Sequence, residues 1–167
     1  FFYQNYFQYE NIPEKELEKN ISETLLKIFY WCSEEGFQDK IKSNIKLSSG
    51  LLDGIPLPDK NRLKWLNSKF IKKLIKDFEK SGFRGSLNRY RAQNLDWEEL
   101  IELEHLNITQ PSIFIGGEHD PVRSFIKDYD EFKNAGKYCT NFMGAFIIEN
   151  AGHWVQQEKP KEVNKVI

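Results

Sequence analysis

A histidine and an aspartate each follow a short apolar run in the second half of the sequence. His153 comes after "GAFIIENAG", and Asp120 comes after "PSIFIGGEH". If both runs are neighbouring parallel strands, their carboxyl ends lie at the same edge of a sheet, where catalytic groups gather. A carboxylate behind an imidazole fixes its tautomer and stabilises the imidazolium that forms when the ring takes a proton. The pattern therefore predicts that His153 is a general base oriented by Asp120.

Simpler roles exist for both residues. Asp120 precedes Pro121, so it also suits the N-cap of a helix with proline at the first helical position, and the two roles can coexist. A lone His153 is by default an ordinary turn or core histidine. The feature that favours a catalytic His153 is its position after one strand while an acid follows the neighbouring strand. His105 and His119 show no such context, and no trio of His, Cys or carboxylate residues has metal-ligand spacing. We expect neither a metal nor a cofactor.

The elements that must position this pair form the last third of the chain. The run 111–117 ends at Gly-Gly and suits a buried parallel strand, as does the run 144–152. Between them, residues 120–132 have the pattern of a helix, and residues 156–167 that of a closing helix with a proline near its start. Strand, helix and strand in this order form one crossover unit, which brings the two strand ends together.

The preceding part of the sequence is helical. Residues 14–32 carry apolar side chains at helical spacing, and residues 59–80 form a second helix after a Gly- and Pro-bearing loop, 48–60. Residues 85–93 and 96–104 look like two short helices. The lysines of helix 59–80 fit a solvated helix face better than a membrane-surface helix. The expected buried face of this helix consists of Leu63, Leu66, Phe70, Leu74 and Phe78.

Composition limits the kind of protein. The chain has 167 residues, of which 14% are aromatic, so it is long enough to bury a real core. Its formal net charge of −1 gives no electrostatic reason to expect nucleic acid or an anionic membrane as a partner. Cys32 and Cys139 stand far apart, and a reduced, cytoplasmic protein is a simpler interpretation than one disulfide bridge. The sequence has no signal peptide or membrane-spanning run.

Two features predict that these residues are part of a longer protein. The chain opens with "FFYQNYFQYE", without an initiator Met and with aromatic residues where natural termini are usually polar. Two apolar parallel strands also need neighbouring strands and helices on both faces of their sheet. We therefore expect a cut at Phe1 and further strands encoded upstream.

Several segments resemble the epoxide hydrolases of the α/β-hydrolase fold. "FIGGEHDPV" and "NAGHWVQQEKPKEVNKVI" are similar to the acid and histidine segments of that family, and "YQNYFQ" and "SGFRGSLNRYR" to its helical cap. The order of acid before histidine, with a nucleophile earlier still, is also that of α/β-hydrolases. The resemblance covers nearly the whole chain. It implies a helical cap at 1–106, the C-terminal part of the core at 107–167, and an absent N-terminal half of that core.

The resemblance also implies roles for residues of the cap. Two cap tyrosines of the family hydrogen-bond the epoxide oxygen, and the matching residues are Tyr3 and Tyr90. Phenol hydroxyls in a dry pocket can stabilise and protonate the alkoxide that ring opening produces. Both tyrosines could instead be core packing, as is usual among aromatic residues. Gln4, Trp31 and Trp154 are weaker candidates for the lining of the substrate pocket.

In that family the nucleophile is an aspartate on a tight strand-to-helix turn, and a His-Gly-x-Pro-type loop supplies the oxyanion hole. The aspartate attacks an epoxide carbon to form an ester, and the histidine, backed by its acid, activates water to release a vicinal diol. This sequence has neither motif, and Asp53 lies in a loop without the required context. The resemblance thus implies hydrolysis of a hydrophobic epoxide with a nucleophile missing from this chain, which alone is expected to be inactive.

Three other functions fit the same residues. Haloalkane and haloacetate dehalogenases share the nucleophile, acid and base. They favour Trp, Asn or His as hydrogen-bond donors to the halide, where this cap has tyrosines. An esterase or lipase would use a serine nucleophile. A truncated hydrolase could also act as a non-catalytic binding partner.

Overall fold

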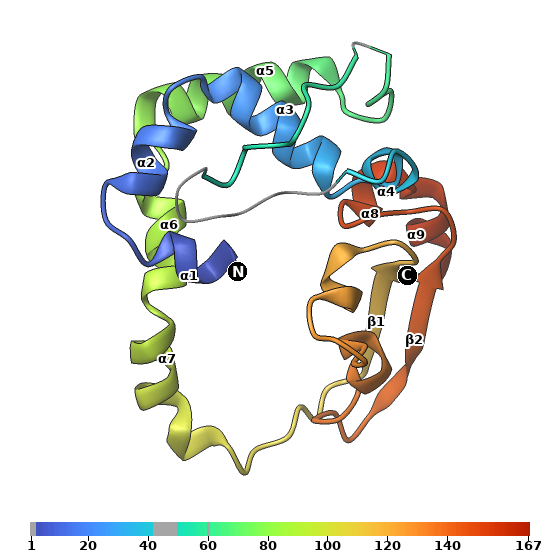
Figure 1. Ribbon diagram of the computed structural model, residues 1–167. Coiled ribbons are helices and arrows are strands. Elements are labelled where there is room, and N and C mark those ends of the chain that lie inside the picture. The colour runs from blue at the N-terminus through green and yellow to red at the C-terminus, as the bar shows by residue number, and fades with distance from the viewer. Residues whose placement is uncertain (1–2, 42–49, 60) are drawn as a thin grey trace. The chain divides into compact units, whose positions relative to one another are not determined.

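The computed structural model describes residues 3–41, 50–59 and 61–167, and the chain divides into two compact units (Figure 1). The first unit is Phe1–Trp31 with Ile41–Glu102, and the second is Cys32–Lys40 with Leu103–Ile167. Within the described ranges, no helix has both the length and the apolar composition needed to cross a bilayer.

The first unit is built from helices. Its helices are α1 (Tyr3–Phe7), α2 (Ile12–Leu17), α3 (Ile21–Trp31), α5 (Ser68–Ser81), α6 (Arg84–Arg91) and α7 (Gln93–Leu100). Helix α3 packs against α5, and α1 packs against α6, so helices far apart in the sequence enclose one core. The buried side chains of that core are Tyr6, Phe7, Leu17, Leu25, Leu51, Phe83 and Leu87.

Two helix predictions in this unit are wrong at their boundaries. The predicted helix 14–32 is two helices, α2 and α3, separated at residues 18–20. The predicted helix 59–80 begins at Ser68, because the Asn67 side chain caps it there. The Asn67 side chain accepts hydrogen bonds from the backbone N–H groups of Lys69 and Phe70. Residue 60 of that prediction lies outside the described residues, as do residues 48–49 and 60 of the predicted loop.

The buried face of α5 agrees with the prediction at Leu74 and Phe78 and differs from it at Phe70. The side chains that pack against the core are Ile71, Leu74, Ile75 and Phe78. Phe70 is 43% exposed and touches Phe29 edge-on, at a centroid distance of 6.3 Å. The lysines of α5 are all exposed, in agreement with the predicted solvated face.

The second unit holds the sheet. Its elements are α4 (Glu34–Gln38), β1 (Ser112–Gly117), the 3₁₀ turns η2 (Pro121–Ser124) and η3 (Glu131–Asn134), β2 (Phe142–Ile148), α8 (Val155–Glu158) and α9 (Pro160–Val166). One further 3₁₀ turn, η1 (Ile101–Leu103), lies at the boundary of the units. Strands β1 and β2 pair in parallel, with Gly117 opposite Ile148, and α9 packs against β2 (Figure 1). The predicted parallel strands are therefore confirmed, although β2 lies at Phe142–Ile148 and not at 144–152.

The predicted helix between the strands is wrong. Residues 120–132 form no α-helix, because two aspartates each begin a short 3₁₀ turn. The Asp120 side chain accepts the N–H of Val122, and the Asp130 side chain accepts the N–H of Phe132. Arg123 then joins the turns through an ion pair with Asp130 at 2.7 Å. Local side-chain bonds of this kind give the backbone an alternative to a continuous helix.

The carboxyl ends of the strands are locked together by close backbone packing. The N–H of Glu118 donates to the carbonyl of Ile148, and the N–H of His119 donates to that of Ala151, both at 2.9 Å. A Cβ atom on Gly117 would overlap the carbonyl oxygens of Ala151 and Gly152, so only glycine fits at the end of β1. This packing fixes the loop after β2 against the loop after β1.

Candidate active site

The loops after the two strands bring Asp120 and His153 into contact within the second unit. The His153 Nδ1 atom lies 2.9 Å from Asp120 Oδ2. The second carboxylate oxygen, Oδ1, accepts the N–H of Val122 at 2.9 Å. Asp120 therefore caps a turn and contacts the imidazole at once, so the two roles that the sequence left open coexist. Its side chain is 8% exposed, whereas that of His153 is 42% exposed.

This contact determines which nitrogen of His153 can act as a base. An ionised carboxylate only accepts hydrogen bonds, so Nδ1 carries the proton that points to Asp120. In the neutral ring the lone pair then lies on Nε2, the nitrogen turned away from Asp120. The hydrogen bond to Asp120 raises the pKa of His153, and partial burial opposes that shift. The ring is thus oriented to take up a proton at Nε2.

An Asp120→Asn substitution is expected to lower the pKa of His153. The amide removes the charge that stabilises the imidazolium, and the hydrogen bond to Asp120 is the largest cause of the raised pKa. Asp120 stabilises the protonated ring, so without its charge the ring loses its proton more readily. The neutral, basic form of His153 should therefore appear at lower pH in the variant. NMR titration of the ring carbons measures this shift, and an unchanged or higher pKa would contradict the assignment.

The neighbours of His153 include an aromatic ring and a thiol. The ring of Trp154 lies edge-on to the imidazole, with a centroid distance of 4.9 Å. The backbone N–H of His153 donates to the carbonyl of Cys32 at 2.8 Å. Burial raises the pKa of the Cys32 thiol to about 12, and the charges of Asp120 and Glu158 add to the effect. The raised pKa disfavours the thiolate at neutral pH, so Cys32 is poorly suited to act as a nucleophile.

A second histidine in this unit has a carboxylate partner that the sequence did not reveal. His119 Nδ1 lies 2.6 Å from Glu34 Oε2, and the ring of Phe37 stacks on His119 at 3.8 Å. Glu34 and Phe37 lie on α4, about 85 residues earlier in the chain, and no local pattern marks that helix as a neighbour of β1.

In the first unit, the structure brings Tyr3 and Tyr90 together. Their rings meet edge to face at 5.7 Å, and Phe7 contacts both rings. Gln4 lies beside them, where its Nε2 donates to the Tyr3 hydroxyl at 3.3 Å. Tyr6 is a different case, because its hydroxyl is buried and donates to Glu16 at 2.6 Å.

Trp31 also belongs to the first unit. It is the last residue of α3, and it packs, partly buried, against the core of that unit. Asp120, His153 and Trp154 share the second unit, whereas Tyr3, Gln4, Trp31 and Tyr90 share the first.

Arg91 ties the helices that carry the two tyrosines. Its guanidinium donates to the carbonyls of Phe7 and Tyr9 at 2.9 and 2.6 Å, and to Glu14 Oε1 at 2.7 Å. The Arg91 and Glu14 side chains are only 14% and 11% exposed. Hydrogen bonding to Arg91 lowers the pKa of Glu14 despite its burial. The end of α1 is thus fastened to the end of α6, next to Tyr90.

An Arg91→Met substitution is expected to lower the free energy of unfolding by about 3 kcal/mol. The variant leaves the Glu14 carboxylate largely buried without its cation, the costly way to break such a pair. Arg89 is the matched control, because its ion pair with Asp96 is exposed, at 72% and 42%. Arg89→Met should cost less than about 1 kcal/mol. Equal losses in urea unfolding would contradict the role of Arg91.

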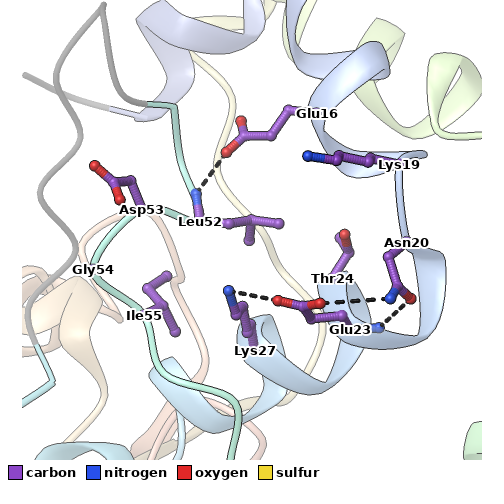
Figure 2. Close-up of a pocket in the computed structure, with 10 residues that line it drawn as sticks. All are labelled: Glu16, Lys19, Asn20, Glu23, Thr24, Lys27, Leu52, Asp53, Gly54 and Ile55. Carbon is purple, nitrogen blue, oxygen red and sulfur yellow. Dashed lines mark hydrogen bonds and ion pairs between the residues drawn. The ribbon is translucent and has the colours of Figure 1, made fainter.

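A cavity of about 470 Å³ in the first unit does not contain the predicted site residues (Figure 2). Its wall carries an ion pair between Glu23 and Lys27 at 2.8 Å, and Glu16, which accepts the N–H of Leu52 at 2.9 Å. Ligand pockets for apolar molecules are lined mainly by apolar side chains, so this wall is a poor match. Within the described part of the chain, no three His, Cys, Asp or Glu residues are arranged to hold a metal ion.

Comparison with known proteins relates both units to one class of enzyme. No protein-family model matches the chain. The chain is 30% identical over its whole length to "Epoxide hydrolase A" of Mycobacterium tuberculosis, and 35% identical to "Bifunctional epoxide hydrolase 2" of Mus musculus. It spans 51% of the first protein and 29% of the second.

Solved structures of epoxide hydrolases have the same fold over these residues. Epoxide hydrolase A from Mycobacterium thermoresistibile superposes with a TM-score of 0.81 at 30% identity, over 99% of this chain and 50% of that one. Potato (Solanum tuberosum) epoxide hydrolase I gives a TM-score of 0.80 at 26% identity, over 98% and 50%. The predicted fold class, the C-terminal half of an α/β-hydrolase, is confirmed.

Proposed function

The chain is homologous over its whole length to a segment of the epoxide hydrolases of the α/β-hydrolase fold, and on this basis we propose that it serves in the hydrolysis of an epoxide to a vicinal diol. The observation that carries the proposal is the contact between His153 and Asp120 at the carboxyl ends of adjacent parallel strands. In this proposal residues 1–106 form the cap, and residues 107–167 the C-terminal part of the core.

The first step opens the epoxide ring. A carboxylate nucleophile attacks one ring carbon, the bond from that carbon to the epoxide oxygen breaks, and an ester and an alkoxide result. Tyr3 and Tyr90 hydrogen-bond the epoxide oxygen, and one of them protonates the alkoxide. The edge-to-face packing of the two rings supports this role, because it holds both phenols close together.

The second step hydrolyses the ester. His153 removes a proton from water through Nε2, and the hydroxide attacks the ester carbonyl. Asp120 stabilises the imidazolium, which then returns the proton to the departing alkoxide of the diol. The nucleophile leaves this step as a carboxylic acid, and its proton restores the phenol of the tyrosine that protonated the first alkoxide. The products are the vicinal diol and the regenerated carboxylate. The raised pKa of His153 supports its capacity to accept the proton.

The nucleophile is proposed to come from a segment outside these residues, the N-terminal half of the hydrolase core. The chain spans about half of Epoxide hydrolase A, the bacterial relative named above. The aspartates of this sequence lack the strand-to-helix turn that a nucleophile requires. The other reactants are water and a small hydrophobic epoxide. With Cys32 and Cys139 both as free thiols, a reducing compartment such as the cytoplasm suits the protein.

The coding sequence upstream of Phe1 and an assay of its product test the proposal. We expect an in-frame segment with a His-Gly-x-Pro motif and an aspartate on a strand-to-helix turn. The joined protein, which is this chain together with that upstream segment, should convert styrene oxide, a small aromatic epoxide, to its diol. Halide release from a haloalkane without diol formation would indicate a dehalogenase instead. A serine at that turn would indicate ester hydrolysis, and the lack of any open frame would leave a non-catalytic chain.

A further inference from the structure

Glu158, the last residue of α8, binds the backbone on both sides of His153. Its Oε2 atom accepts the N–H of Gly152 at 3.0 Å, and its Oε1 atom accepts the N–H of Trp154 at 3.1 Å. Oε2 also accepts the N–H of Glu34 at 2.9 Å. One carboxylate thus binds three peptide groups, two of which flank the histidine.

A further backbone hydrogen bond holds the segment that carries His153. The N–H of His153 donates to the carbonyl of Cys32, two residues before Glu34. The segment 32–34 is therefore joined to the segment 152–154 both directly and through Glu158. A Cβ atom on Gly152 would overlap the backbone of residues 32–34, so the two segments are in close van der Waals contact. Little freedom remains for the backbone that carries the imidazole.

We propose that Glu158 is a positioning residue, whose carboxylate fixes the backbone of His153 so that the imidazole stays in reach of Asp120. The proposal rests on the proposed function only for the role of His153 as a base. Helix capping alone does not account for the contacts, because an N-cap interaction explains the bond to Trp154 but not those to Gly152 and Glu34.

The electrostatic setting is consistent with this role. Burial raises the pKa of Glu158, and the three N–H groups oppose the shift by stabilising the carboxylate. The charge of Glu158 also contributes to the raised pKa of His153, after the larger effect of Asp120. A glutamine could accept hydrogen bonds through one oxygen only, and its NH₂ group would face at least one backbone N–H.

A measurement on the unaltered protein tests the network directly. Protonation of Glu158 weakens its hydrogen bonds, so the amide signals of Gly152, Trp154 and Glu34 should shift with pH around one shared midpoint. Burial places that midpoint above the ordinary value for a glutamate. NMR of the 167-residue chain records the three signals in one titration. Three unrelated midpoints, or no shift at all, would overturn the proposal.

Substitutions test the effect on the base. In Glu158→Gln the pKa of His153 should fall, because a charge is lost and the loop is loosened. In Glu158→Asp, which keeps the charge, the pKa of His153 should fall less. The control is Glu162→Gln, which changes an exposed carboxylate on the next helix, α9, and should leave the pKa of His153 unchanged. Equal pKa values of His153 in the Glu158→Gln and Glu162→Gln variants would overturn the proposal.

Kinetics separate this proposal from the proposed function. In the joined protein, Glu158→Gln should lower kcat by about 10²-fold with little change in KM. A catalytic group that is misplaced by about 1 Å can cost that much in rate. The NMR results do not depend on turnover. Shared midpoints together with no diol formation would reject the epoxide reaction but keep the positioning role, whereas full kcat in Glu158→Gln would reject that role.

Discussion

A His153→Gln variant of the joined protein is expected to accumulate a covalent ester and to lose at least about 10²-fold in turnover. The first step needs the carboxylate nucleophile and the tyrosines, so the ester still forms. Its hydrolysis needs a base, and a positioned base contributes about 10²–10⁴-fold. Glutamine keeps much of the size and polarity of the ring but cannot take a proton from water.

Intact-protein mass spectrometry measures this result. The variant should gain the mass of one epoxide molecule within a single turnover and keep it, whereas the unaltered protein should return to its own mass. His105→Gln is the control, because that histidine is exposed. Full turnover by the His153→Gln variant would contradict the assignment of the base.

Removal of the Tyr90 hydroxyl is expected to slow ring opening by about 10²-fold. When negative charge develops on an oxygen in a dry site, removal of one hydrogen-bond donor to that oxygen slows the reaction by about 10²–10³-fold. Tyr90→Phe keeps the edge-to-face contact with Tyr3 and the contact with Phe7, so packing should be preserved. Tyr3→Phe should have a similar effect, and the double variant should open the ring more slowly than either single variant.

Pre-steady-state kinetics separate this effect from the later hydrolysis. Ester formation should slow in Tyr90→Phe, whereas the breakdown of preformed ester should keep its rate. Tyr9→Phe is the matched control, since Tyr9 lies in the same stretch as Tyr3 but is 41% exposed. An equal loss in Tyr9→Phe, or an unchanged rate of ester formation in Tyr90→Phe, would show that the hydroxyl does not act on the epoxide.

The fold was predictable where the sequence pattern is strong. The apolar runs before His153 and Asp120 are strands because they are too short for helices and end at glycines, and parallel pairing follows from the segment between them. Helix boundaries were less predictable, because single side chains decide them. Asn67 starts α5 later than the apolar pattern indicates, and two aspartates turn 120–132 into 3₁₀ segments.

The candidate site was predictable only in part. Asp120 and His153 could be paired because the ends of adjacent parallel strands must lie close together. The residues that support them could not, since Glu34 and Cys32 lie more than 100 residues before His153 in the chain. Their neighbourhood depends on how α4 packs, which no local pattern specifies. Glu158 is close in sequence, but a glutamate on a short helix is common and gives no sign of three backbone bonds.

A single-turnover reaction in ¹⁸O-labelled water tests the central claim most directly. The joined protein, in excess over styrene oxide, should yield a diol without label, because the new hydroxyl oxygen comes from the carboxylate nucleophile. The label should appear on the protein, where the water activated by His153 attacks the ester carbonyl. A diol that carries ¹⁸O in the first turnover would mean that water attacks the epoxide directly, and would contradict the ester mechanism and the role assigned to His153.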